Sequence, residues 1–248
     1  MRGKRITLEY HLSIRSARYP VRVFLEPRRN CSFSVTPRNL LLRLPQNTRP
    51  REITAHLSQL RAWAEEVIDK YPKAFQRIGI REYRDGDLLR VGGRQYTLRI
   101  TEDKRRTHTA RLRGDTIFLC LREEAPPVER AKAVQTLLSR ILAADFREEI
   151  EERVHHLNRQ TVNRPIRRIA LKYNTSNWGS CSSDGNINFS TRLLFTPPHV
   201  QDYVILHELV HLVEPNHSDR FWATVAHYMP DYEQREQWLR ENGHHTYL

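Results

Sequence analysis

Residues 203–222 read YVILHELVHLVEPNHSDRFW, and this stretch decides what the C-terminal part of the chain can be. Apolar residues dominate its first half, which predicts a buried helix. Four polar residues interrupt the pattern: His207, Glu208, His211 and His217. Burying such groups costs free energy unless each of them finds a partner. They must therefore either pair with one another inside a core or hold a metal ion.

The spacing of the first two histidines suits a metal. His207-Glu208-Leu209-Val210-His211 has the form H-E-x-x-H, and residues four apart project from one face of a helix, about 6 Å apart along its axis. Two imidazoles placed in this way can reach one ion at about 2.0–2.1 Å. In such sites the glutamate takes a proton from the water that the metal activates. Glu208 is therefore the expected general base.

A third ligand is needed, because two ligands do not hold zinc firmly. His217 lies ten residues after His207, and a continuous helix would carry it away along the axis. Pro215 prevents that continuation, since the residue before a proline is pushed out of the α region, and Asn216 suits a turn. A bend here would bring His217 to the same ion. Glu214 is the alternative, either as the third ligand or as an acceptor that orients a ligand histidine.

The composition of the 248 residues is that of a soluble globular protein with one large domain or two modest ones. No apolar run approaches the roughly 20 residues that span a bilayer, and we see no secretory signal, so we expect no membrane partner. Three widely scattered cysteines form no disulfide framework, which indicates the cytoplasm.

The chain is strongly basic. Its net charge of +12 predicts a weak attraction to polyanions, nucleic acid first, although a basic solvated surface would have the same composition. KRRTHTARLR at 104–113 is the densest basic stretch. We interpret it as a solvated hairpin or, alternatively, as a contact for a polyanion.

The order of predicted elements indicates an α+β protein in two parts. Residues 1–125 form a β-rich N-terminal region with Gly turns and one inserted helix over 50–68. A pair of prolines after residue 125 marks the predicted boundary. Residues 126–248 begin with one long helical pattern over 128–160, followed by two short strands, the helix with the motif and one or two final helices.

The stretch from Trp178 to Leu239 resembles the YgjP-like metallopeptidase family, a zincin group related to SprT- and WLM-type proteases. The matching pieces are WGSCS at 178–182, GNI at 185–187, YVILHELVHL at 203–212, NHSDRFW at 216–222 and PDYEQREQWL at 230–239. This resemblance implies a zincin-like metallopeptidase domain over residues 126–248, with the H-E-x-x-H motif on a helix.

By the same resemblance His207, His211 and His217 would bind Zn²⁺, with Glu208 as the base. We therefore expect a zinc-dependent metallopeptidase that hydrolyses peptide bonds of a peptide or protein substrate with water activated by the metal. The rival hypothesis is a nucleic-acid-associated binding protein whose zinc is structural, with Glu214 as the nearby candidate for a fourth ligand. A protease that acts on DNA-bound proteins would combine the two and would resemble SprT- and WLM-type relatives.

Two segments ahead of the motif have structural interpretations. WGSC at 178–181 offers Ser180 and Cys181, but the sequence identifies no base near either side chain. We interpret this segment as a turn that packs Trp178 against the motif helix. GNINFS at 185–190 fits an edge strand that pairs with an extended peptide.

Overall fold

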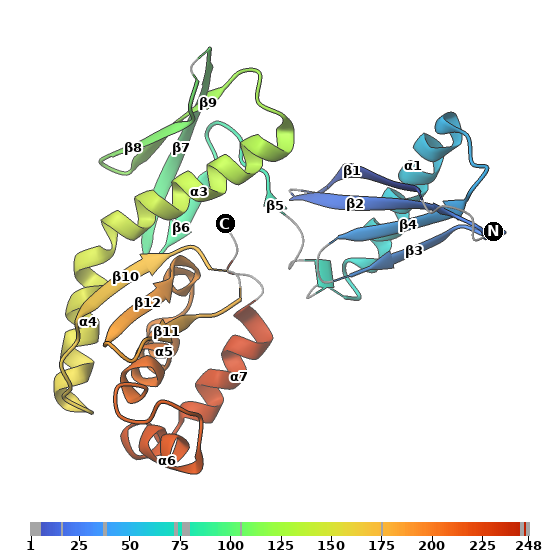
Figure 1. The fold of residues 1–248 in the computed structure, drawn as a ribbon. Helices are drawn as coiled ribbons and strands as arrows, with labels where there is room; N and C mark the ends of the chain where they lie inside the picture. The colour runs from blue at the N-terminus through green and yellow to red at the C-terminus, as the bar shows by residue number, and fades with distance from the viewer. Residues whose placement is uncertain are drawn as a thin grey trace. The chain divides into compact units, whose positions relative to one another are not determined.

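The computed structural model describes residues 6–15, 17–36, 39–71, 74–75, 80–104, 106–174, 176–243 and 246. The chain divides into two compact units (Figure 1). The first unit comprises Met1–Tyr83 with Pro126–Lys132, and the second comprises Arg84–Ala125 with Ala133–Leu248. The strands that follow residue 84 are thus grouped with the C-terminal part, whereas the sequence placed the boundary at residue 125.

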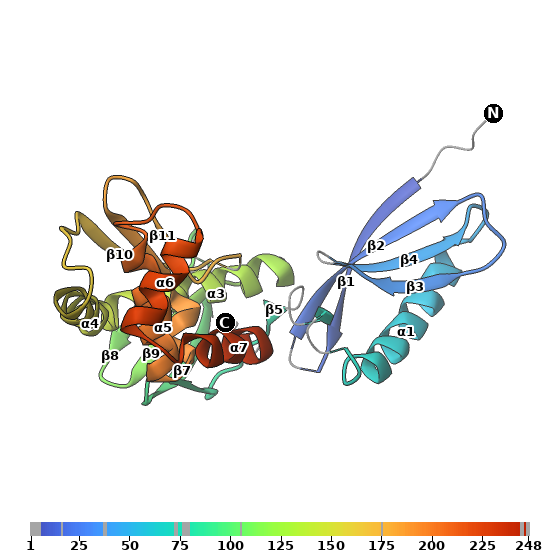
Figure 2. The ribbon, with the colours of Figure 1, turned by 90° about the horizontal axis from the view of Figure 1, so that it is seen from below.

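The first unit is a sheet with a helix on one face. Its elements are β1 (Ile6–Ile14), β2 (Ala17–Glu26), β3 (Ser32–Val35), β4 (Leu40–Pro45), α1 (Pro50–Val67) and β5 (Ile80–Arg81). The strand order is β1-β2-β4-β3, with β5 paired to β2; the β2–β4 pair is parallel and the other pairs are antiparallel. Figure 2 shows α1 along one face of this sheet. There α1 buries Ile53, Leu57 and Leu60 in the core of the unit.

The second unit contains two sheets and most of the helices. Its elements are β6 (Leu88–Val91), β7 (Arg94–Asp103), β8 (Thr109–Arg113), β9 (Thr116–Arg122), α3 (Pro127–Asp145, whose first residues are grouped with the first unit), α4 (Arg147–Gln160), β10 (Arg168–Lys172), β11 (Gly179–Cys181), β12 (Asn186–Ser190), the 3₁₀ helix η1 (Thr191–Phe195), α5 (Pro198–Val210), α6 (Asp219–Tyr228) and α7 (Tyr232–Asn242). One sheet has the order β6-β7-β9-β8 and the other β10-β12-β11. No helix among the described residues is long and apolar enough to cross a membrane.

Contacts between distant segments explain why the four-stranded sheet is grouped with the C-terminal part. Asp145, the last residue of α3, accepts a hydrogen bond from the Arg94 guanidinium of β7 at 2.8 Å. The backbone N–H of Gly92, in the turn between β6 and β7, donates to the carbonyl of Leu194 in η1 at 3.1 Å. These partners are far apart in the sequence, so a boundary chosen from two prolines could not take them into account.

The helical pattern over 128–160 is two helices rather than the single helix that we predicted. Phe146 has φ −99° and ψ 5°, which interrupts the helix between α3 and α4. Its buried ring lies beside Gly92, and the Arg94 guanidinium sits 4.3 Å from the ring centroid. The break thus coincides with a buried ring that packs against a distant turn, and hydrophobic spacing does not reveal it.

The three-stranded sheet corrects two predictions. β12 is the central strand, parallel to β10 and antiparallel to β11, so GNINFS is not an edge strand. The WGSC segment is not a turn, because Gly179–Cys181 forms β11 at the edge of the sheet. β11 lies against α5, which brings this edge to the helix that carries the motif.

Candidate metal centre

α5 carries the first histidine and the glutamate of the motif. His207 lies in its last turn, Glu208 follows, and His211 caps the C-terminus with φ −63° and ψ −15°. Pro215 lies just beyond, and the N–H of Glu214 donates to the Val210 carbonyl at 2.9 Å to close the last turn. The helix therefore ends where the proline predicts an end.

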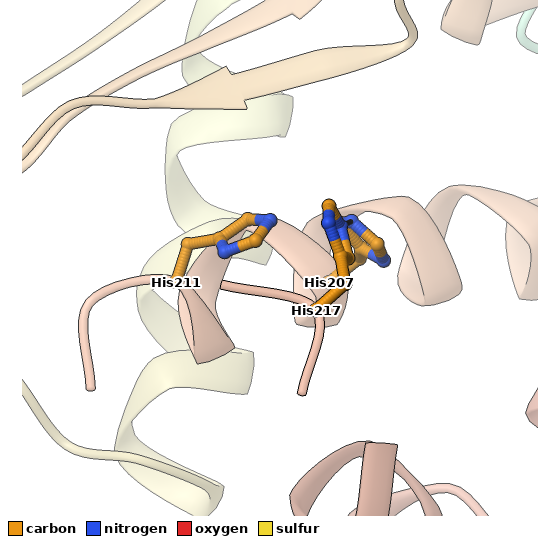
Figure 3. A group of neighbouring side chains, drawn as sticks. All are labelled: His207, His211 and His217. Carbon is orange, nitrogen blue, oxygen red and sulfur yellow. Dashed lines mark hydrogen bonds between the residues drawn. The ribbon is translucent and has the colours of Figure 1, made fainter. Parts of the chain in front are cut away.

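The chain then turns back toward the helix. Ser218 caps the start of α6, and its hydroxyl accepts a hydrogen bond from the backbone N–H of Phe221 at 3.4 Å. His217 lies immediately before this cap, in the short connection between α5 and α6. The bend expected from Pro215 and Asn216 is thus present, and it returns His217 to the end of α5 (Figure 3).

The three imidazoles converge on one point (Figure 3). One nitrogen of each of His207, His211 and His217 lies within 4.8 Å of the others. The Nε2 atoms of His207 and His217 are 2.9 Å apart. Two nitrogens that bind a tetrahedral zinc ion at about 2.0–2.1 Å are about 3.3 Å apart, so these two need to separate by only about 0.4 Å. The spacing of these two donor atoms is therefore close to that of two ligands of a single ion.

A backbone carbonyl orients one of these rings. The Nδ1 of His211 lies 3.2 Å from the carbonyl oxygen of Glu214, so Nδ1 carries the proton and donates it. This leaves the lone pair of Nε2 for an ion, as is usual for a histidine ligand whose other nitrogen is hydrogen-bonded. The Glu214 carboxylate instead faces Arg220 at 3.6 Å. It does not belong to the group of neighbouring ligand atoms, which consists of nitrogens of His207, His211 and His217. Glu214 thus contacts the site through its backbone.

Burial keeps the imidazoles of His207 and His211 in the neutral form that binds metals. Desolvation, with smaller contributions from the charges of His211 and His217, lowers the pKa of His207 to about 3. Burial also lowers the pKa of His211, against a smaller opposite effect of its hydrogen bond to Glu214. Neutral imidazole is a good ligand for zinc and for several other divalent transition metals. These two imidazoles can therefore bind an ion without first losing protons.

Aromatic rings form the floor beneath the histidines. Phe221 of α6 is fully buried, and its ring centroid lies 4.8, 4.6 and 4.8 Å from those of His207, His211 and His217. Trp222 stacks on His217 at 5.8 Å with 28° between the planes. These rings restrict the imidazoles without offering a competing ligand.

The carboxylate of Glu208 is placed in a space that only a glycine leaves open. Glu208 is 5% exposed, and its carboxylate has no hydrogen-bond donor or charged partner among the described residues. Burial raises its pKa to about 8. A Cβ atom on Gly179 of β11 would lie 2.5 Å from the Glu208 Oε1 atom. The edge strand therefore approaches the glutamate closely because residue 179 has no side chain.

The start of β11 is held by a second set of contacts, and sequence reasoning missed them. The guanidinium of buried Arg192 lies 4.2 Å above the Trp178 ring and donates to the carbonyl of Gly243 at 2.7 Å. Gly243 in turn makes room for the edge of the Trp178 ring. The backbone N–H of Ser190 donates to the Trp178 carbonyl at 2.8 Å. The Trp178 ring thus packs against the end of α7, which fixes the residue that precedes Gly179.

A cleft of about 1120 Å³ opens over the site. It is lined by β11 and the preceding Trp178, by α5 with His207 and Glu208, by the connection that holds His217, and by Leu239 of α7. The three histidines and the buried carboxylate thus share one cleft with an edge strand, and the cleft is large enough for part of a polypeptide.

Gly179→Ala tests the contact between β11 and Glu208. The added methyl group would overlap the glutamate side chain, so we expect Glu208 to be displaced and peptide hydrolysis to fall about 10²-fold, the effect of a misplacement of about 1 Å. Metal content should stay unchanged, because the histidines are not touched. Steady-state kinetics and elemental analysis check both statements. Ser58→Ala, at an exposed position of α1 outside the cleft, is the control and should retain activity.

Comparisons with known proteins show the family of the chain. Residues 29–242 match the family described as YgjP-like, metallopeptidase domain. That match covers most of the 248 residues, and the chain belongs to the YgjP-like metallopeptidase family. Among solved structures, the crystal structure of the metallopeptidase zymogen of Pyrococcus abyssi abylysin is similar, with 20% identity and a TM-score of 0.34 over 37% of this chain and 93% of that chain. No curated protein matches the chain.

Proposed function

We propose that the chain is a zinc-dependent metallopeptidase in which His207, His211 and His217 bind Zn²⁺ and Glu208 is the general base. The observation that carries the proposal is the convergence of three imidazoles next to a buried carboxylate in a single cleft. Membership in a metallopeptidase family supports the same reaction.

The chain's own residues supply the proton transfers. A bound zinc ion would lower the pKa of a water molecule and polarise the carbonyl of the substrate. Glu208 accepts the proton of the attacking water and passes it to the nitrogen of the leaving amine, so that the water adds to the carbonyl carbon and the C–N bond breaks. Its carboxylate suits this transfer because no other residue that the structure describes holds it in an ion pair.

The edge strand offers a place for the substrate backbone. β11 has a single described partner strand, β12, and its three residues line the cleft. An extended peptide can add to such an edge by main-chain hydrogen bonds. We therefore infer that the substrate lies along Gly179–Cys181, with its scissile bond beside Glu208. This also requires the substrate segment to be unfolded where it binds.

The number of ligands favours a catalytic zinc over a structural one. Structural zinc sites are usually closed by four protein ligands, whereas catalytic sites use three and leave one position for water or substrate. The group of ligand atoms in the described part of the chain has three members, and the Glu214 carboxylate is not among them. A binding protein with a closed zinc site is therefore the weaker hypothesis.

Metal removal and restoration test the proposed function. Purified protein is expected to contain about one zinc ion per chain and to cleave an unfolded polypeptide such as reduced casein. A strong chelator should abolish cleavage, and about one equivalent of Zn²⁺ should restore most of it. Elemental analysis and peptide products measured on the same samples provide the result. Cleavage that continues in metal-free protein would contradict the proposal.

A further inference from the structure

One face of the β6-β7-β9-β8 sheet is basic and open to solvent. The side chains of β9 alternate between buried and partly exposed, with Ile117, Leu119 and Leu121 on the buried side. Because successive side chains of a strand point to opposite faces, Phe118 and Cys120 lie on the other face. That face has no role in the metal centre, since none of its described residues lines the cleft.

The strand register shows which residues share this face with Phe118. Arg99 of β7 and Arg111 of β8 are the direct partners of Phe118 on either side. Neighbouring strands are about 4.8 Å apart, so an arginine flanks the ring on each side. The Arg111 guanidinium lies 5.4 Å from the centroid of the Phe118 ring. An aromatic ring therefore stands at the centre of a row between two cations.

Further residues extend the same pattern. Thr97, Thr116 and Arg113 are aligned in the next row, and Arg90 is opposite Gln95 beyond it. Arg90, Arg99, Arg111 and Arg113 are exposed. Together with Phe118 these four residues define what we call the basic sheet face. Arginine and threonine side chains can donate hydrogen bonds to phosphate oxygens, and arginine can also stack on a base.

Most of this positive charge is not neutralised by the protein itself. Arg99 pairs with Asp85 at 3.4 Å, and both side chains are more than half exposed. Arg90, Arg111 and Arg113 have no ion-pair partner among the described residues. Exposed ion pairs contribute little, so Arg99 can exchange its partner at small cost. The face thus presents four cations whose charge is available to a polyanion.

We propose that the basic sheet face binds single-stranded nucleic acid. An open sheet that places an aromatic ring among arginines is the arrangement on which unpaired bases stack while their phosphates contact cations. A duplex would present only its backbone, because its bases are already stacked. An acidic polypeptide would match the charge but would make no use of Phe118. The proposal goes beyond the peptidase reaction and does not depend on it.

Two variants of the full-length protein separate charge from stacking. Binding of a fluorescently labelled 20-mer of deoxythymidine is measured by anisotropy between 50 and 200 mM salt. R111E/R113E is expected to weaken binding at least about tenfold and to reduce the slope of log K against log salt by about 1.4, because two phosphate contacts are lost. Phe118→Leu keeps the apolar packing, and it should weaken binding about tenfold with an unchanged slope.

The matched control is a variant with the same change in net charge at positions outside the basic sheet face. R51E/R159E reverses two exposed arginines, on α1 and α4, that have no ion-pair partner among the described residues. This control should bind within about twofold of the native protein, and R111E/R113E should retain native zinc content and peptide hydrolysis. The proposal fails if the control loses as much affinity as R111E/R113E. It fails equally if polyglutamate or a duplex of the same length competes as well as the single strand.

Discussion

A Glu208→Gln variant is expected to keep its zinc and to hydrolyse an unfolded polypeptide about 10³-fold more slowly than the native chain. Glutamine has nearly the shape of glutamate, so the space beside Gly179 stays filled and the histidines are not disturbed. An amide accepts no proton at neutral pH, and the transfer from the attacking water to the leaving amine therefore fails. Elemental analysis and kcat/KM measured on one preparation check both halves of this expectation.

A second carboxylate near the site provides the control for that variant. Glu214 contacts the site through its backbone carbonyl, whereas its side chain pairs with Arg220 near the surface. Glu214→Gln should therefore change hydrolysis by no more than about twofold, because such exposed pairs contribute little. If Glu208→Gln protein free of native enzyme hydrolysed peptides at the native rate, another group would have to accept the proton.

The sequence predicts those features of the site that depend only on residues close together along the chain. The distance from His207 to His211 is one helical turn, and Pro215 ends the helix by its own stereochemistry. Both statements need only neighbouring residues. The convergence of His217 with the other two rings follows from them, and the structure brings these nitrogens together. Their assignment as zinc ligands remains a prediction until a metal is measured.

The parts that the sequence does not predict depend on residues distant along the chain. The close approach of Gly179 to Glu208 joins an edge strand to a helix, and neither segment carries a periodic signal for the other. Trp178 was expected to pack on the motif helix, but its ring is held by Arg192 against Gly243. Arg192, which stacks on the indole ring of Trp178, is buried, although arginine side chains are usually exposed.

The order of the strands likewise depends on contacts between residues that are distant along the chain. The β-rich patterns and both hairpins of residues 84–125 were predicted from alternation and from Gly turns, and the structure has them. Which part of the chain these strands join was not predictable, because the decision rests on contacts such as that of Arg94 with Asp145. Alternation along β12 likewise shows a strand but not whether it lies at the centre or the edge of a sheet.

His211→Ala is expected to lose the metal and the hydrolytic activity together. Two imidazoles remain in this variant, and two ligands do not retain zinc against dialysis with a chelator of moderate affinity. The fold should survive, because His211 is only partly buried and Phe221 still packs beneath the site. Zinc per chain should thus fall from about one to near zero, while the circular dichroism spectrum stays native.

The matched control for this loss is His227→Ala, which removes an exposed histidine of α6 outside the described group of ligand atoms. It should retain both zinc and activity, because exposed residues away from the site contribute little to either. A parallel His217→Ala variant distinguishes the two candidates for the third ligand. If Glu214 were that ligand, His217→Ala would keep its zinc and Glu214→Ala would lose it. We expect the reverse, because the His217 Nε2 atom lies 2.9 Å from that of His207 whereas the Glu214 carboxylate faces Arg220.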